Sequence, residues 1–177
     1  MRRPRTSETL RGPAERLLNE CGICTAPVPI ERVAEHLGAS IRYSPFEGEL
    51  AGILVRRDGE DTVIGVNSLH HPNRQRFTIA HECGHLILHR GKDVYIDRAF
   101  RVNRRDSVSS QATDPDEIEA NRFAAELLMP YELIIRDTVD EMIDVEDAEE
   151  IKELAERYGV SVQALTHRVT KIYKNIF

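Results

Sequence analysis

The residues best suited to do chemistry are His81, Glu82 and His85, which form a His-Glu-x-x-His sequence within residues 76–89. On an α-helix each residue turns by about 100°, so the two histidines lie one turn apart on the same face and can bind one Zn²⁺. Glu82, on the flank of that face, points to the open coordination position, where water binds. There it can take a proton from the water that attacks a peptide carbonyl and later return it to the leaving amine. This spacing predicts metal-dependent peptide hydrolysis.

The residues around this motif indicate a packed helix and argue against a chance match. Ile79, Cys83, Leu86 and Ile87 fall on the side of the helix away from the histidines. Apolar residues therefore share one face and polar residues the other, as in a helix that packs on a core. We expect this helix to extend over about residues 72–91.

His89 continues the four-residue spacing of the two histidines. On a straight helix its Cα would lie about 12 Å along the axis from that of His81, which disfavours binding of both to one ion. We expect His89 to orient a metal ligand or to interact with the last carbonyl groups of the helix.

Hydrolytic zinc sites use three protein ligands plus water, and residues 114–130 offer three glutamates for the missing ligand. Glu119 ranks first, because it lies at the edge of an apolar stripe, where a carboxylate needs a cation as partner. Glu117 ranks second, because the Asp-Pro helix start before it forms a capping box and gives it a structural role. Glu126 ranks third, since a surface ion pair explains it.

Length and composition indicate one globular domain, because 177 residues with 41% hydrophobic and 31% charged side chains can bury a core. No apolar run approaches the roughly 18 residues needed to cross a bilayer, and the basic start lacks the apolar segment of a secretory signal. We therefore expect a cytoplasmic protein with no membrane association. The net charge of −6 argues against nucleic-acid binding through a broad basic surface.

Three cysteines are too few for a disulfide framework. The Cys21-x-x-Cys24 pair lacks the second pair of a zinc ribbon, so we expect reduced thiols there. Cys83 lies on the far side of the metal helix from His81 and is expected to pack in the core like a small apolar residue.

The order of the expected elements divides the chain into three parts. Residues 1–12 are rich in arginine and predict a flexible N-terminal tail. Residues 13–136 predict a metallopeptidase domain, and residues 137–177 an acidic and helical segment packed on it. Between the strands and the third-ligand segment, residues 92–113 predict an irregular loop that either lines a substrate cleft or is a solvated connection. Besides the metal helix, the domain is expected to contain helices at 13–20 and 29–38, and a small antiparallel sheet of about three strands at 41–43, 51–55 and 62–67.

Residues 151–169 predict two short amphipathic helices with a turn at Gly159 and a cap at Ser161. This is the sequence form of a helix-turn-helix, and Arg168 with two lysines on the second helix could contact DNA. The acidic stretch at 137–156 would repel phosphate groups, so we expect no DNA binding. The alternative is a DNA-binding transcriptional regulator in which the metal site senses zinc or only holds the fold.

Two segments occur in the order typical of one protein family: RFTIAHECGH at 76–85 and EANRFAAELLMP at 119–130. With them, the chain resembles the ImmA/IrrE family of bacterial and phage zinc metallopeptidases. The resemblance covers most of the chain, from the VAEHLG segment at 33–38 to Val160-Ser161.

The resemblance implies an α+β fold with a zincin-like core, a small antiparallel sheet, a metal-binding helix and a C-terminal helical pair resembling a helix-turn-helix. It implies Zn²⁺ as cofactor, with His81, His85 and Glu119 as ligands and Glu82 as the catalytic acid and base. It also implies a protein substrate: cleavage of a helix-turn-helix transcriptional repressor would relieve repression of a mobile element or a stress regulon.

Overall fold

The structure is a computed structural model that describes residues 2–48, 50–56, 61–89, 94–98, 114–140, 143–145 and 147–174. Helices and strands alternate along this part of the chain, which confirms the α+β class. The strands are β1 (Ala39–Ser44), β2 (Leu50–Val55), β3 (Thr62–Asn67) and β4 (Val94–Arg98). The helices are α1 (Ser7–Glu20), α2 (Ile30–His36), α3 (Pro72–Leu88), α4 (Pro115–Leu128), α5 (Tyr131–Ile135), η2 (Arg136–Asp140, a π-helical turn), α6 (Ala148–Tyr158) and α7 (Val162–Lys174).

The sheet has four strands in the order β1-β3-β2-β4 and differs in two ways from the expected one. First, β1 pairs with β3 in parallel, while β2 is antiparallel to both β3 and β4. The reason is that β2 runs back between β1 and β3 along the chain, so the two strands that flank it point the same way. Second, β4 lies within residues 92–113, which were expected to be irregular. The Asp58-Gly59 turn expected between β2 and β3 lies outside the described residues.

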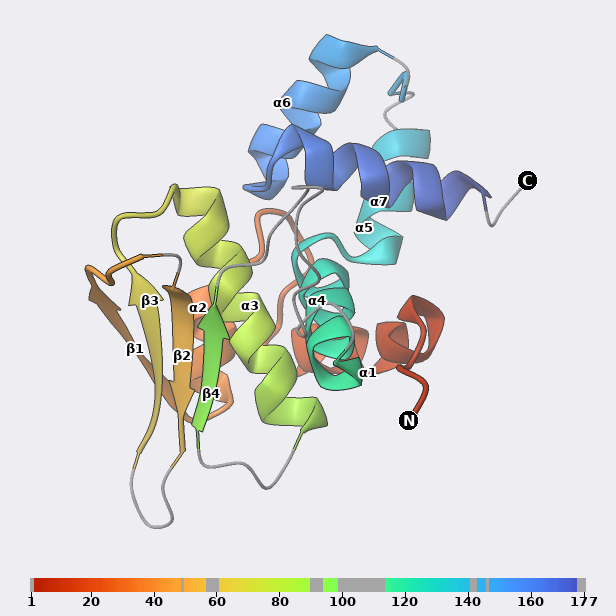
Figure 1. Cartoon of the computed structure of the whole chain (residues 1–177). Coiled ribbons are helices and arrows are strands. Elements are labelled where there is room, and N and C mark those ends of the chain that lie inside the picture. The colour runs from red at the N-terminus through yellow and green to blue at the C-terminus, as the bar shows by residue number, and fades with distance from the viewer. Residues whose placement is uncertain are drawn as a thin grey trace.

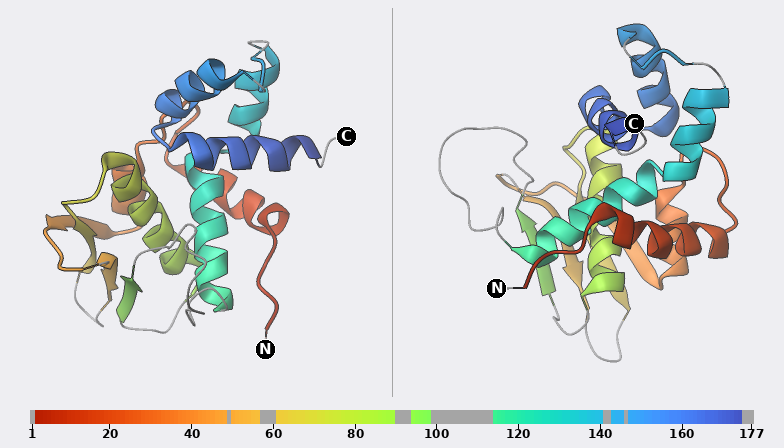
Figure 2. Two further views of the ribbon diagram at one scale, coloured as in Figure 1. Left: turned by 45° about the horizontal axis from the view of Figure 1, so that its top comes forward. Right: turned by 90° about the vertical axis from the view of Figure 1, so that its right-hand side faces the viewer.

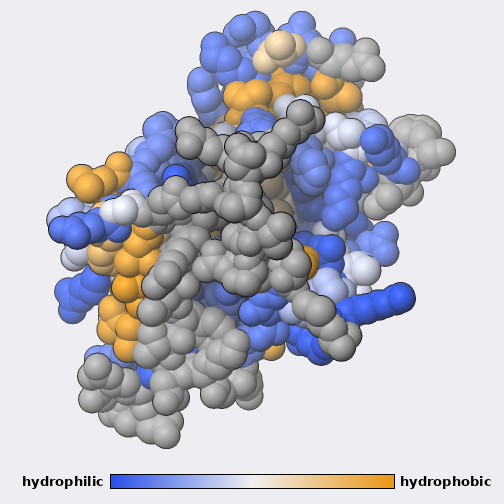
Figure 3. Space-filling model, in the orientation of Figure 1, coloured by the Kyte–Doolittle hydropathy of each residue, from blue (hydrophilic) through white to orange (hydrophobic). Residues whose placement is uncertain are grey.

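Helix α3 lies between the sheet and the other helices (Figure 1). It packs on β2 and β3 on one side and on α4 on the other, and α1 crosses the far side of α4 (Figure 2, right). Helices α6 and α7 cover one end of this arrangement. In the space-filling view, apolar side chains gather over the strands and between the two C-terminal helices (Figure 3). The helix with the His-Glu-x-x-His motif is therefore the central element of the fold.

The N-terminal segment is ordered further toward its start than the sequence indicated. Helix α1 begins at Ser7, with the Thr6 side chain accepting a hydrogen bond from the backbone N–H of Thr9. The expectation of a flexible tail through residue 12 is wrong for this helical part, because Leu10 is completely buried and extends the apolar stripe of the helix. The domain division at residues 13–136 and 137–177 stays a prediction.

Helices α3 and α4 approach each other closely at Gly84. A Cβ atom at Gly84 would lie 3.0 Å from the Cα and 3.2 Å from the carbonyl oxygen of Ala120. These are backbone atoms of α4, which cannot move without shifting the whole helix. The missing side chain at Gly84 therefore sets the distance between the two helices that carry the candidate metal ligands.

We predict that Gly84→Ala destabilises the protein, although alanine is the better helix former by about 0.5–1 kcal/mol. The added methyl group overpacks the contact with Ala120, which typically costs about 1–3 kcal/mol. Gly84→Val should cost more than Gly84→Ala. Urea unfolding measures both effects, and an increase in the free energy of unfolding for the alanine variant would contradict the close approach.

The C-terminal helical pair forms as the sequence predicted. Asp147 caps α6 by accepting from the backbone N–H groups of Glu149 and Glu150, and Gly159 ends the helix with a left-handed φ of 63°. Ser161 Oγ accepts from the backbone N–H of Ala164 at the start of α7. The proposed DNA contact of Arg168 is another matter.

Arg168 is buried and paired with a carboxylate of the neighbouring helix. Its Nη1 and Nη2 donate to the two carboxylate oxygens of Glu126 at 2.7 and 2.5 Å, and its Nε donates to the carbonyl of Met129 at 3.0 Å. The expectation that Arg168 could face DNA is wrong, because this bidentate pair fastens α7 to α4. The surface ion pair expected for Glu126 is a buried one.

We predict that Glu126→Ala lowers the free energy of unfolding by about 3–5 kcal/mol, because it leaves the Arg168 guanidinium buried without a counter-charge. The matched control is the exposed pair of Lys152 and Glu149 on α6, 3.2 Å apart. Lys152→Ala should cost less than about 1 kcal/mol, as is usual for exposed ion pairs. Equal effects in chemical denaturation would contradict the buried pairing.

All three cysteines are free, and Cys83 is completely buried in the core, as expected. Among the described residues, no helix is both long and apolar enough to span a bilayer.

Candidate metal centre

Local sequence determines where α3 begins and ends. Pro72 is its first residue, and the side chain of His71 accepts a hydrogen bond from the backbone N–H of Asn73. The helix ends at His89, whose backbone N–H bonds to the carbonyl of His85. These bounds agree with the expected range, and they bury the motif residues in the middle of the helix.

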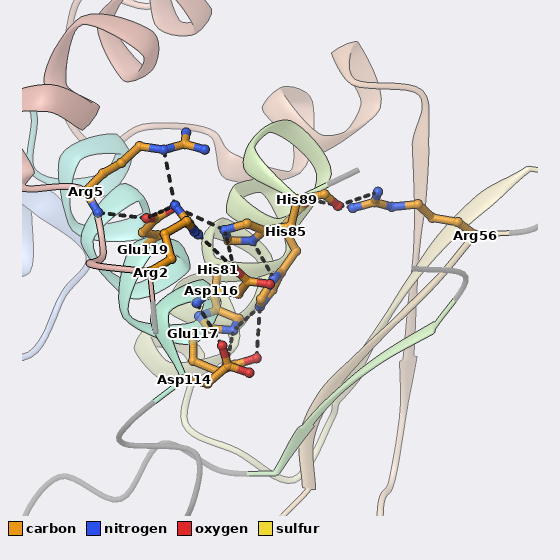
Figure 4. A network of polar contacts seen from close by, with 10 residues as sticks. All are labelled: Arg2, Arg5, Arg56, His81, His85, His89, Asp114, Asp116, Glu117 and Glu119. Carbon is orange, nitrogen blue, oxygen red and sulfur yellow. Dashed lines mark hydrogen bonds and ion pairs between the residues drawn. The ribbon is translucent and has the colours of Figure 1, made fainter. Parts of the chain in front are cut away.

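His81, His85 and Glu117 converge on one point between α3 and α4 (Figure 4). The two imidazole Nε2 atoms lie 3.0 Å apart. Glu117 Oε2 lies 3.3 Å from Nε2 of His81, and Oε1 lies 3.4 Å from Nε2 of His85. Ligands at 2.0–2.1 Å around a tetrahedral zinc ion are about 3.3 Å from one another, so this donor set fits a single Zn²⁺-sized ion.

Both imidazoles are held from behind by a second hydrogen bond. His81 Nδ1 lies 3.0 Å from the amide oxygen of Asn121, and His85 Nδ1 lies 3.0 Å from Nδ1 of His89. When Nδ1 carries the proton and donates it to such a partner, Nε2 keeps its lone pair for a metal. The role of His89 in orienting a ligand was expected, whereas Asn121 was not singled out in the sequence.

The protonation states of the cluster suit a cation. Burial lowers the pKa of His85 to about 4, so its imidazole is neutral at neutral pH. Burial opposes ionisation of Glu117, but hydrogen bonds with His81 and His85 outweigh it and lower the pKa of the carboxyl group. Neutral imidazole and ionised carboxylate are the forms in which these groups bind metals.

Glu119, the expected third ligand, lies outside this cluster. Its carboxylate accepts from Arg2 Nη1 and from the backbone N–H of Arg5, both at 2.7 Å. The buried carboxylate does have the cationic partner that its position requires, but the cation is an arginine of the N-terminal segment. Its only printed link to the histidines runs through His89, 3.3 Å away.

Helix geometry explains why Glu117 replaces Glu119 at this place. Two residues apart on a helix, the two side chains point about 200° away from each other. Glu117 shares its face with Asn121, four residues later, and this face lies against α3. The capping function expected of Glu117 is carried by Asp114 instead, which accepts from the backbone N–H of Asp116. The spacing of Glu117 and Asn121 is the sequence signal that could have identified the ligand.

Glu82 is completely buried and lies where α3 meets β2. A Cβ atom at Gly52 of β2 would lie 2.4 Å from Cγ2 of Thr78 and 3.2 Å from Oε1 of Glu82. Only glycine therefore allows the strand to pass this close to the carboxylate. Gly52 was not singled out in the sequence, and the catalytic role of Glu82 stays a prediction.

A helix with two histidines one turn apart, packed on a small sheet and faced by a glutamate from a later helix, defines a zincin-like core. The family comparison agrees with this class. Residues 34–170 match the family model Peptidase_M78, described as the IrrE N-terminal-like domain, and the chain belongs to this family.

Two relatives extend the comparison. The chain is 35% identical over 116 residues to the radiation response metalloprotease IrrE of Deinococcus radiodurans, covering 64% of this chain and 32% of that protein. A solved structure of a Mycobacterium tuberculosis transcriptional regulator has a similar fold, with a TM-score of 0.59 and 21% identity over 92% of this chain and 46% of that chain. The chain thus spans less than half the length of either relative.

Proposed function

We propose that this protein is a zinc-dependent endopeptidase that cleaves a helix-turn-helix transcriptional repressor. The observation that carries the proposal is the convergence of His81 Nε2, His85 Nε2 and the Glu117 carboxylate on one point. In this proposal Glu117 takes the place of Glu119 as third ligand, and Glu82 keeps the role of catalytic acid and base. Membership of the Peptidase_M78 family and the similarity to a metalloprotease support it.

The mechanism assigns a task to each residue. When bound, a divalent ion supplies Lewis acidity toward the peptide carbonyl and lowers the pKa of water. His81, His85 and Glu117 hold this ion, while Asn121 and His89 keep the two imidazoles in the tautomer that leaves Nε2 free to bind. Glu82 accepts a proton from the attacking water and delivers it to the nitrogen of the leaving amine, so that the peptide bond is replaced by a carboxylate and an amine.

The sheet offers a place for an extended substrate. Strand β4 is paired with β2 on one side and is the last strand on that edge of the described sheet. Backbone groups at such an edge can pair with an extended peptide segment. A repressor loop that adds to this edge would run beside α3, which carries the motif. A repressor as substrate also places the reaction in the cytoplasm.

The direct test is cleavage of a purified repressor encoded beside the gene for this protein. Incubation with Zn²⁺ should produce one defined pair of fragments, and a chelator should prevent it. Mass spectrometry of the fragments locates the scissile bond. An intact repressor in the presence of a zinc-loaded protein would contradict the proposed substrate.

The rival function is a DNA-binding regulator, favoured by the helical pair that turns at Gly159 and by the similar fold of a transcriptional regulator. Two contacts speak against it. Arg168 of the second helix is buried against Glu126, and Lys171 Nζ lies 2.6 Å from Ser7 Oγ of α1. A gel shift with the DNA of the neighbouring operator separates the two functions, because the peptidase should not retard DNA.

A further inference from the structure

A chain of contacts connects the start of the protein with the back of the metal centre (Figure 4). We use the name N-terminal arm for Arg2–Thr6, which precedes α1. Arg2 donates through Nη1 to Glu119 at 2.7 Å and through Nη2 to Asp116 at 2.9 Å. The backbone N–H of Arg5 and its guanidinium Nε add contacts to Glu119 at 2.7 and 3.4 Å. The arm therefore encloses a carboxylate whose side chain has no exposed surface.

From Glu119 the contacts continue to a candidate ligand. Glu119 Oε2 lies 3.3 Å from Nε2 of His89, and Nδ1 of His89 lies 3.0 Å from Nδ1 of His85. The direction of these bonds follows from the ligand role of His85. If Nε2 of His85 binds a metal, its Nδ1 carries the proton and donates it to Nδ1 of His89. His89 must then carry its own proton on Nε2, where it donates to the ionised Glu119.

The backbone around His89 is held separately from its ring. Arg56 of β2 donates to the carbonyl groups of His85 and His89 at 2.5 and 3.0 Å, at the end of α3. These bonds fix where the ring is attached but not its tautomer or its rotation. Glu119 and the N-terminal arm remain as the groups that determine both.

We propose that Glu119 and His89 are positioning residues for His85, and that the N-terminal arm completes their arrangement through Arg2 and Arg5. The inference rests on the proposed metal site and extends it by three elements that bind no metal themselves. It gives the buried Glu119 a function different from that of a ligand. Loss of any member of the chain frees His85 to rotate or to change tautomer, and the metal binds less tightly.

The test compares metal binding by the wild type with that of Glu119→Gln and of the double variant Arg2→Ala/Arg5→Ala. Chelator competition measures the zinc dissociation constant, and visible absorption of the cobalt-substituted protein reports the geometry of the ligands. Both variants should bind zinc about 10–100-fold more weakly, as for other groups that orient metal ligands, and should shift the cobalt bands. Arg3→Ala is the matched control, because Arg3 is an exposed arginine of the same arm; it should behave as the wild type.

A merely structural arm predicts a different outcome. Both variants would then unfold at lower urea concentration yet keep the zinc affinity and the cobalt spectrum of the wild type, which would overturn the inference. The double variant leaves all of α4 unchanged, so it decides the matter even if Glu119→Gln fails to fold. Failure of the metal site itself looks different again, because the wild type would then bind no zinc.

Discussion

Glu82→Gln is expected to abolish cleavage while the protein keeps its metal. Glutamine has nearly the same shape as glutamate and can remain beside Gly52, but it cannot accept a proton from water. Loss of general acid and base catalysis typically reduces rates by about 10²–10⁴-fold. Repressor cleavage followed over time, together with zinc content by mass spectrometry, measures both parts of this prediction.

The control for this variant is Glu153→Gln, the same change at an exposed position of α6. It should leave both cleavage and zinc content unchanged. If Glu82→Gln in its fully metal-loaded form still cleaves at a rate near that of the wild type, Glu82 is not the proton carrier and the mechanism is wrong.

The second large effect concerns the choice between two glutamates of α4. Glu117→Gln should weaken zinc binding by more than about 100-fold, because a direct ligand is lost and the ordinary range for supporting groups is 10–100-fold. Glu119→Gln should stay within that supporting range. Chelator competition on both proteins gives the two dissociation constants side by side.

The reverse order would restore the ranking that the sequence alone suggested. If Glu119→Gln abolished zinc binding and Glu117→Gln left it nearly unchanged, the positions of these side chains between α3 and α4 would have to be wrong. The urea midpoint of each variant serves as a control, since a protein that does not fold says nothing about either ligand.

Sequence alone predicted the parts of the fold that depend on local pattern. The metal helix was expected at about 72–91 and spans Pro72–Leu88. The turn at Gly159 and the cap at Ser161 were also predicted, because a left-handed residue and a capping hydroxyl have strong local signatures. These elements carry the two histidines and the C-terminal helical pair.

The sheet was less predictable because strand pairing is not local. Strand β4 lies in a stretch that looked irregular, and it becomes a strand by pairing with β2, more than 40 residues earlier. The parallel pairing of β1 with β3 depends in the same way on the path of the chain between them. Period-2 patterns indicate a strand but do not determine its neighbour.

The third ligand shows where reasoning from single residues reached its limit. The rule that a buried carboxylate needs a cation applies to Glu119, but it does not say which cation. Because the N-terminal arm was read as a flexible tail, Arg2 and Arg5 were not considered as its partners. The metal then took their place in the argument, and Glu117 was left with the capping role that Asp114 fulfils.

The most direct test of the account is a crystal structure of the zinc-loaded protein with anomalous diffraction at the zinc edge. We expect one strong peak about 2.0–2.2 Å from Nε2 of His81, Nε2 of His85 and a carboxylate oxygen of Glu117, with Glu119 still bound by Arg2. A peak coordinated by Glu119, or no peak between the two histidines at saturating zinc, would contradict it.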